Sequence, residues 1–309
     1  MMTFRSNFKQ RFLLLAVKII IQSIALLPLS VCHRLGHVMG LILFYLPNRH
    51  LNISKTNIML CFPHYSTLQQ RNLVKHSMLE LGKTVMEMPV IFHAPHKRIQ
   101  SYVKQVSGEH YAEQALIAGK GIILAAPHLG CWEISGLYCS IRFGITSLYR
   151  PPRMVYLEQL LLQARQRFGA KLVPTDTQGI KQLYTTLQNN GVVGILPDQD
   201  PGQSTGEFVP FFGIPAKTMV LLARLARKTK APVFFVYSER LPKGQGFHLH
   251  FIPCHCDLYG GELSQAVQCS NAMVELCVTR IPTQYQWSYK RFRTRPAGEP
   301  ELYHNKVKP

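Results

Sequence analysis

Short apolar runs and longer amphipathic segments alternate along the chain from about residue 119 to residue 280. Runs of roughly four to eight apolar residues bounded by glycine or proline predict buried strands, and apolar residues spaced by three or four predict helices. We predict strands at 119–126, 145–149, 171–174, 192–196, 233–237 and 247–252. We predict helices at 66–89, 131–143, 156–168, 179–189, 217–230 and 264–280. This alternation predicts an α/β fold with a mostly parallel central sheet flanked by helices.

The N-terminal region has a different pattern, because residues 12–31 are almost entirely apolar and follow a basic segment. The run is long enough to enter or cross a bilayer, and it is too long for the apolar part of a signal peptide. Lys18 and Gln22 interrupt it, so a helix lying in the membrane interface is an alternative to a spanning helix. A second apolar run at 38–46 would complete a hairpin. We therefore expect an N-terminal hydrophobic membrane-anchoring helix within an anchor region of residues 1–48, with its topology open.

The charge balance calls for an anionic partner. Lys and Arg number 35 against 16 Asp and Glu, which gives a formal net charge of +19. Nucleic acid, anionic lipid headgroups and acidic proteins all have suitable chemistry. We expect no nucleic acid partner, since neither an aromatic-rich nucleic-acid motif nor a helix-turn-helix is evident. The hydrophobic fraction of 47% is ordinary for a soluble protein, so membrane contact should be local.

The eight cysteines show no even framework, and Cys61, Cys139 and Cys277 lie in apolar contexts where a thiol acts as a small hydrophobe. We therefore expect reduced cysteines and a domain on the cytoplasmic side. The cluster that could hold a metal comprises His248, His250, Cys254, His255 and Cys256. Alternation along a strand would place the first two histidines on one face, but the paired spacing of a zinc site is missing. We favour a structural strand, with no metal and no cofactor.

The candidate chemistry lies at residues 121–133, where a buried-strand pattern runs into His128 and Glu133 follows five residues later. Reactive side chains of α/β enzymes tend to lie at the carboxyl ends of strands. A turn at 129–130 and a helix from about residue 132 would let Glu133 reach one imidazole nitrogen, leaving the other as a general base. The alternative is a histidine at a strand end with an unrelated glutamate on the next helix.

Further candidates follow other predicted strands. Arg150 and Asp198 should converge with His128 at one sheet edge. Asp198 and Asp200 could hold an acceptor or bind a basic residue, although Pro-Asp-Gln-Asp-Pro-Gly is also a turn sequence. Arg150 and Arg165 could bind phosphate groups, and a helix end explains Arg165 equally well. An apolar pocket could be lined by residues that core packing explains equally well, namely Phe208, Phe211, Phe212, Ile214 and Met219.

The segments 128–133, 148–152, 194–202 and 208–213 resemble the lysophospholipid acyltransferase superfamily. The segments 57–63 and 284–296 make the chain more narrowly similar to the late acyltransferases of lipid A biosynthesis, the lauroyl and myristoyl transferases of Gram-negative inner membranes. The aromatic and basic run at 284–296 is the most specific of these motifs. The resemblance covers nearly the whole chain in the family's order.

The resemblance implies acyl transfer from an acyl carrier protein thioester to a hydroxyl of a phosphorylated glycolipid, a lipid A precursor of the Kdo-lipid IVA type. It makes His128 the base and Glu133 its partner, and it assigns importance to Arg165 and Asp198. Residues 49–309 would be the acyltransferase catalytic domain, on the cytoplasmic side of the inner membrane. The alternatives are an acyltransferase for another lysolipid or glycolipid, and a non-catalytic membrane-tethered protein that binds anionic lipid or nucleic acid.

Overall fold

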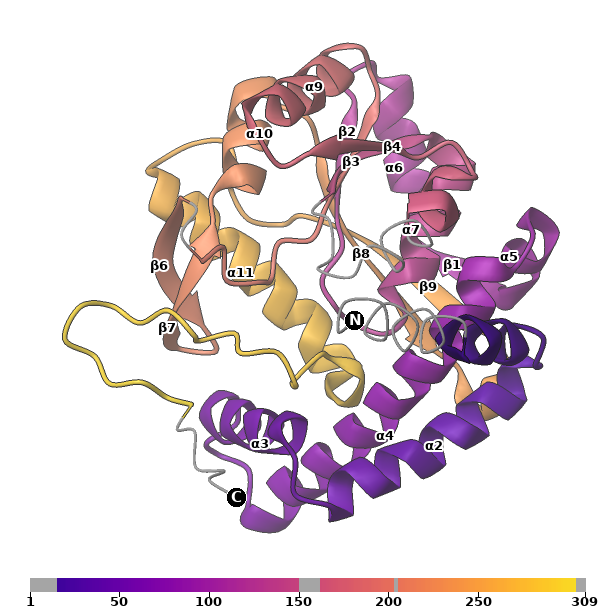
Figure 1. The fold of residues 1–309 in the computed structure, drawn as a ribbon. Coiled ribbons are helices and arrows are strands. Elements are labelled where there is room, and N and C mark those ends of the chain that lie inside the picture. The colour runs from indigo at the N-terminus through magenta and orange to yellow at the C-terminus, as the bar shows by residue number, and fades with distance from the viewer. Residues whose placement is uncertain (1–15, 150–161, 203–204, 304–309) are drawn as a thin grey trace, which may run out of the picture.

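The computed structural model describes residues 16–149, 162–202 and 205–303, and it shows a central sheet covered by helices on both faces (Figure 1). The seven-stranded sheet has the order β1-β9-β8-β2-β5-β3-β4. Its strands are β1 (Val103–Ser107), β2 (Ile122–Ala125), β3 (Ile145–Tyr149), β4 (Lys171–Pro174), β5 (Val192–Ile195), β8 (Val233–Arg240) and β9 (Phe247–Pro253). All neighbours are parallel except β8 and β9. The predicted α/β fold with a mostly parallel sheet is confirmed.

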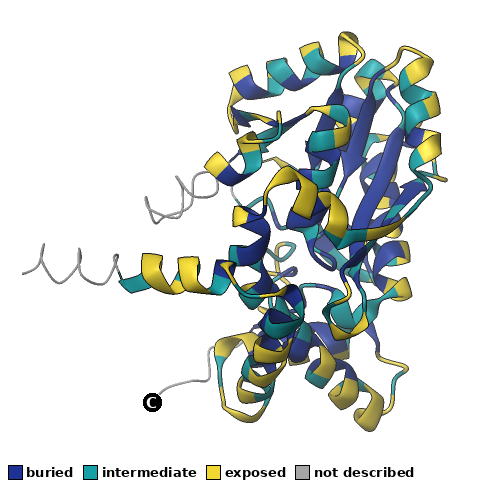
Figure 2. Cartoon of the chain, turned by 90° about the vertical axis from the view of Figure 1, so that its right-hand side faces the viewer, coloured by how far each residue is buried: buried dark blue, intermediate teal, exposed yellow. Residues whose placement is uncertain are grey.

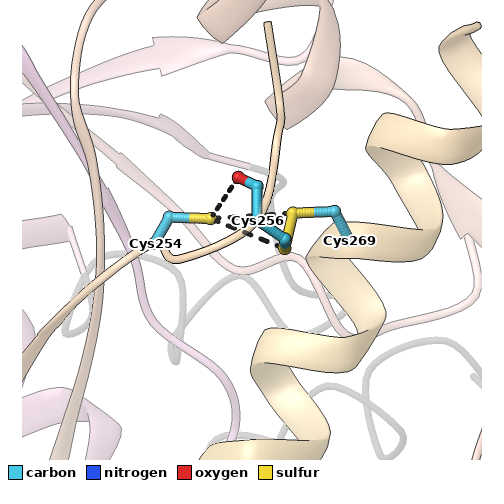
Figure 3. Close-up of side chains that lie close together, drawn as sticks. All are labelled: Cys254, Cys256 and Cys269. Carbon is cyan, nitrogen blue, oxygen red and sulfur yellow. Dashed lines mark hydrogen bonds between the residues drawn. A yellow bond between two sulfur atoms is a disulfide. The ribbon is translucent and has the colours of Figure 1, made fainter. Parts of the chain in front are cut away.

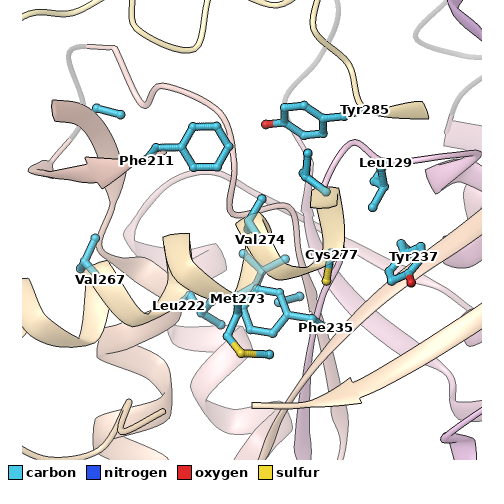
Figure 4. Close-up of a cluster of buried hydrophobic side chains, with 14 of the residues drawn as sticks. Leu129, Phe211, Leu222, Phe235, Tyr237, Val267, Met273, Val274, Cys277 and Tyr285 are labelled. Carbon is cyan, nitrogen blue, oxygen red and sulfur yellow. The ribbon is translucent and has the colours of Figure 1, made fainter. Parts of the chain in front are cut away.

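Two apolar cores lie on the two faces of this sheet, because its central strands are apolar on both sides. One face is covered by α9 (Thr177–Gln188), α10 (Leu221–Thr229) and α11 (Leu263–Arg280). The other is covered by α5 (His96–Tyr102), α6 (Glu109–Ile117) and α7 (Trp132–Phe143). Figure 4 shows the first core, in which Leu222, Phe235 and Met273 lie together between the sheet and α10 and α11.

A two-stranded antiparallel hairpin corrects one predicted helix. β6 (Gly206–Phe211) pairs with β7 (Ile214–Met219), so the start of the predicted helix 217–230 is strand and the helix begins only at Leu221. The turn of the hairpin has positive φ at Phe212 and Gly213. The predicted helix 156–168 lies partly outside the described residues.

The predicted apolar helix over residues 12–31 is wrong in its described part, because one helix ends at Ala25 and α2 (Leu29–Tyr45) begins after Pro28. Two further helices follow, α3 (Arg49–Cys61) and α4 (Thr67–His93). Within the described residues no single helix is long and apolar enough to cross a membrane. Taken together, α2 and α3 meet that test by length and composition, with a bend of 79° between them.

Helix α2 packs directly against α4 through glycines. A Cβ added to Gly36 would lie 2.5 Å from the Cα of Lys83, and one added to Gly40 would lie 2.4 Å from the Cα of Leu79. Much of this N-terminal region is exposed, as Figure 2 shows for the Ala16–Ala25 helix, and large apolar side chains are among the exposed residues. Exposed large apolar residues here are Ile19, Ile20, Leu26, Leu35, Val38, Ile42, Tyr45 and Leu46.

The cysteines only partly follow the prediction of free thiols. Cys61, Cys139 and Cys277 are free and buried, as expected. Cys256 and Cys269 form a disulfide, which contradicts it. The two residues are 13 positions apart, and the fold brings them together because the loop after β9 returns to α11.

Candidate active site

His128 and Asp198 meet at the carboxyl edge of the sheet. His128 follows β2 and Asp198 follows β5, the adjacent parallel strand. The Asp198 carboxylate accepts two hydrogen bonds from His128, at 2.9 Å from the backbone N–H and 2.8 Å from ring Nδ1. Their side chains are only 12% and 2% exposed. The predicted convergence of these two residues is confirmed, whereas Arg150 lies outside the described residues.

The partners of the ring fix its tautomer. Because a carboxylate only accepts hydrogen bonds, Nδ1 carries the proton that it donates to Asp198. The amide Nε2 of Gln199 lies 3.1 Å from ring Nε2 and donates to it. Ring Nε2 therefore presents a lone pair, as a general base requires. Sequence analysis did not select Gln199, although it lies between the two candidate aspartates after β5.

Asp198 is held as a carboxylate. Burial alone would raise its pKa, but the electrostatic interaction with His128 and the hydrogen bonds from its ring and backbone lower the pKa below the usual value. A permanently charged acceptor on Nδ1 stabilises an imidazolium that forms when Nε2 takes a proton. The pair therefore has the arrangement of a base and its orienting acid.

The expected contact between Glu133 and the imidazole is not formed, since Asp198 occupies the Nδ1 side. Helix α7 begins at Trp132, whose ring lies 5.1 Å from that of His128. Glu133 is one residue further and points about 100° around the helix. Its carboxylate accepts hydrogen bonds from Arg165, at 2.5 Å from Nη2 and 3.0 Å from Nε.

Asp200 binds the C-terminal segment rather than facing His128. It accepts hydrogen bonds from the backbone N–H groups of Gly202, at 2.7 Å, and Thr294, at 2.8 Å. The guanidinium of Arg293 lies 3.4 Å away. Asp200 thus forms a turn and also binds a basic residue, which are two of the roles considered for this segment.

An apolar cavity of about 100 Å³ lies between α7 and strands β2, β3 and β5. Trp132, Glu133 and Arg165 line one part of it, so it begins one side chain away from His128. Small residues, among them Gly136 and Gly194, also line this cavity. The phenylalanines predicted to line a pocket do not contribute to this cavity; Phe211 and Phe212 pack in the core against aromatic neighbours.

The segment that contains His128 is held by the C-terminal motif. The N–H of Gly130 donates to the carbonyl of Gln284 at 3.0 Å, and the N–H of Gln286 donates to the carbonyl of His128 at 3.0 Å. Asn57, from the N-terminal motif, donates to the carbonyl of Trp287 at 2.7 Å. Motifs from the two ends of the chain therefore support one loop.

Gly130 and a buried ion pair complete this support. Gly130 has a φ of 62°, and an added Cβ would lie 1.7 Å from the carbonyl oxygen of Ser238, so the turn requires glycine. Its own carbonyl accepts a hydrogen bond from Arg240 at 2.9 Å. Arg240 is paired in turn with the fully buried Glu87.

Comparison with known families gives a match over most of this sequence. The model of the bacterial lipid A biosynthesis acyltransferases matches residues 3–294. The chain belongs to this family. Its members' common chemistry makes this protein an acyltransferase of lipid A biosynthesis, as the sequence resemblance implied.

Individual relatives of the chain are also named as acyltransferases. The chain is 28% identical to the lipid A biosynthesis lauroyltransferase of Escherichia coli over 278 residues, which cover 90% of both chains. It is 26% identical to the palmitoleoyltransferase of the same organism over the same share of both chains. A phosphatidylinositol mannoside acyltransferase of Mycobacterium tuberculosis is 28% identical over 54% of each chain. The chain is thus similar over most of its length to enzymes that are named for different acyl chains.

Proposed function

We propose that this acyltransferase moves a fatty acyl chain from an acyl carrier protein thioester to a hydroxyl of a phosphorylated lipid A precursor of the Kdo-lipid IVA type. His128 is the general base and Asp198 orients it. The observation that carries this proposal is the unprotonated Nε2 of His128, which accepts a hydrogen bond from Gln199 and lies beside an apolar cavity.

In the proposed reaction the acceptor hydroxyl takes the position of the Gln199 amide and donates to Nε2. His128 removes the proton while the oxygen attacks the thioester carbonyl, giving a tetrahedral oxyanion. Collapse breaks the C–S bond, and the imidazolium returns the proton to the departing thiolate. The acyl group passes directly to the acceptor, and no side chain becomes acylated.

Arg165 supplies positive charge near the reacting carbonyl. Its guanidinium lines the cavity and is held by two hydrogen bonds to Glu133. A preorganised donor of this kind stabilises an oxyanion most strongly in a site that excludes water. We therefore assign Glu133 the role of positioning Arg165, and Arg165 either the oxyanion or a phosphate of the acceptor.

The cavity beside Trp132 would hold the acyl chain. It is enclosed by apolar and small side chains of the sheet and α7, which suits a hydrocarbon. Gly136 is the position at which its depth can be changed, because a Cβ added there meets no atom within 4 Å. Residues 1–48 would supply the membrane anchor and residues 49–309 the catalytic domain.

The exposed apolar face of α2 would lie in the interface of the inner membrane. Leu35, Val38 and Ile42 follow one another at helical spacing on that face and are 45–55% exposed. Arg34 and Arg49 are exposed near them and would contact anionic headgroups. In this proposal the domain lies on the cytoplasmic side, where an acyl carrier protein can reach it.

Acyl transfer by the purified protein in detergent tests the proposal. The donors are acyl carrier protein and coenzyme A thioesters, and the acceptors are the tetra-acylated, sugar-bearing lipid A precursor and a lysophospholipid. His128→Ala should abolish transfer, and His93→Ala, an exposed histidine on α4, should not. Product on the lysophospholipid alone would overturn the acceptor, and full activity of His128→Ala would overturn the base.

A further inference from the structure

Three cysteines gather at the edge of the sheet opposite His128 (Figure 3). The N–H of Cys254 bonds to the carbonyl of Val233, the first residue of β8. Since β8 runs parallel to β2, whose carboxyl end leads to His128, the cluster lies at the far edge. Cys254 and Cys256 belong to the loop after β9, and Cys269 comes from α11.

The sulfur atoms have the spacing of ligands to one ion. Sγ of Cys254 lies 3.9 Å from that of Cys256 and 3.7 Å from that of Cys269. Zinc binds thiolates at about 2.3 Å with tetrahedral angles, which places two bound sulfurs about 3.8 Å apart. Two of the three separations therefore already suit a single zinc ion. The third is closed by the disulfide between Cys256 and Cys269.

We propose that Cys254, Cys256 and Cys269 form a zinc-binding site once a cellular dithiol has reduced the Cys256–Cys269 disulfide. The dithiol gives up two electrons and two protons, becomes a cyclic disulfide and leaves three thiols. Zinc then replaces their three protons, which pass to solvent. In the oxidised chain the site is closed, since the two bonded sulfurs cannot separate to the ligand spacing.

Zinc would fix the loop after β9 to α11. Among the described residues no fourth histidine, cysteine or carboxylate falls within the same 4.8 Å cluster, which leaves the fourth position to water. Helix α11 holds the β6–β7 hairpin, since Glu275 accepts from the N–H of Phe212 at 2.7 Å and Asn271 donates to Pro210 at 2.8 Å. The zinc site would stabilise this part of the fold without contacting the residues proposed to carry out the reaction.

The test uses the full-length protein reduced with a dithiol, freed of it without oxygen and titrated with zinc against a chromogenic chelator. We expect about one zinc per chain for the wild type and for Cys277→Ser, a free buried cysteine on the same helix. Cys254→Ser, Cys256→Ser and Cys269→Ser should each weaken binding by more than the roughly 10–100-fold that loss of an outer-shell partner costs.

A second measurement needs no variant. Zinc should protect three of the thiols of the reduced wild type from alkylation, and peptide mass spectrometry should place them at 254, 256 and 269. Absence of zinc binding, or binding that survives Cys254→Ser, would overturn the proposal. Binding lost instead in His248→Ala would also overturn it and would assign the metal to the separate group of Glu239, His248 and His250.

Discussion

The variant Asp198→Asn distinguishes the role of Asp198 from that of Glu133, the two acids that the sequence placed near His128. Asp198 accepts from both the backbone N–H and Nδ1 of His128, and an asparagine has a single oxygen for these two donors. If that oxygen keeps the backbone hydrogen bond, the NH2 group faces Nδ1. The ring must then accept at Nδ1 and carry its proton on Nε2, where it can no longer act as a base.

The size of this effect follows from general base catalysis and from the matching substitution in serine proteases. A positioned base contributes about 10²–10⁴-fold, and the wrong tautomer in the Ser-His-Asp triad costs about 10⁴-fold. We expect Asp198→Asn to lower kcat by about 10²–10⁴-fold, which is about 2.7–5.4 kcal/mol. The volume of the side chain is nearly unchanged, so the fold should persist.

The assay is single-turnover acyl transfer to the glycolipid acceptor, with thermal unfolding as the check on folding. Glu133→Gln is the matched carboxylate-to-amide change, and it should cost less because Glu133 acts through Arg165. The reasoning would be refuted if Asp198→Asn stayed within about threefold of the wild type. It would equally be refuted if Glu133→Gln cost more than Asp198→Asn, since Glu133 would then orient the base.

Three other predictions concern the cavity and the buried contacts. Gly136→Leu should shorten the cavity and so disfavour long acyl donors by about tenfold or more relative to short ones, as measured by competition between donors. The control Gln114→Leu, on the exposed face of α6, should leave this preference unchanged. Glu87→Gln should destabilise the fold by about 3–5 kcal/mol in urea at neutral pH, because Arg240 loses its buried partner. Burial would raise the pKa of Glu87, but Arg240 and His33 lower it to about 2, so this difference should be complete above about pH 4.5 and vanish as the pH falls towards 2. Gly40→Val should cost at least about 1–3 kcal/mol by the same unfolding assay, since its Cβ would collide with α4; no loss would contradict the packing of α2 on α4.

The sheet was predictable because its central strands are short apolar runs. β3 and β4 have the predicted bounds, and β2 and β5 lie within theirs. β1 was missed because none of its residues is fully buried and its sequence, Val-Lys-Gln-Val-Ser, contains no apolar run. The hairpin was missed because the residues of β7 run without a break into a helix, and spacing along the chain does not show where the strand ends.

The site could be predicted from the sequence only where its residues directly follow predicted strands. Apolar runs ending at His128 and at Asp198 placed both residues at one edge of the sheet. Their pairing depends on β2 and β5 being neighbours, which is a property of the strand order and is absent from the local sequence. Glu133 was assigned to the wrong partner although α7 begins at Trp132 as that assignment required, because Asp198, which is distant in the sequence, takes the Nδ1 side of His128 and Arg165 binds the Glu133 carboxylate.

Structural support for the loop of His128 extends to the N-terminal helices. His33 of α2 hydrogen-bonds to Glu87 of α4 at 2.8 Å, Glu87 pairs with Arg240 of β8, and Arg240 binds the carbonyl of Gly130. All three side chains are buried, so removing one leaves a polar group without its partner in the interior. The helix whose outer face is proposed to lie in the membrane is therefore joined, through one buried chain of hydrogen bonds, to the loop that carries the proposed base. A change in the packing of α2 against α4 would therefore alter the hydrogen bond to the carbonyl of Gly130, two residues from His128.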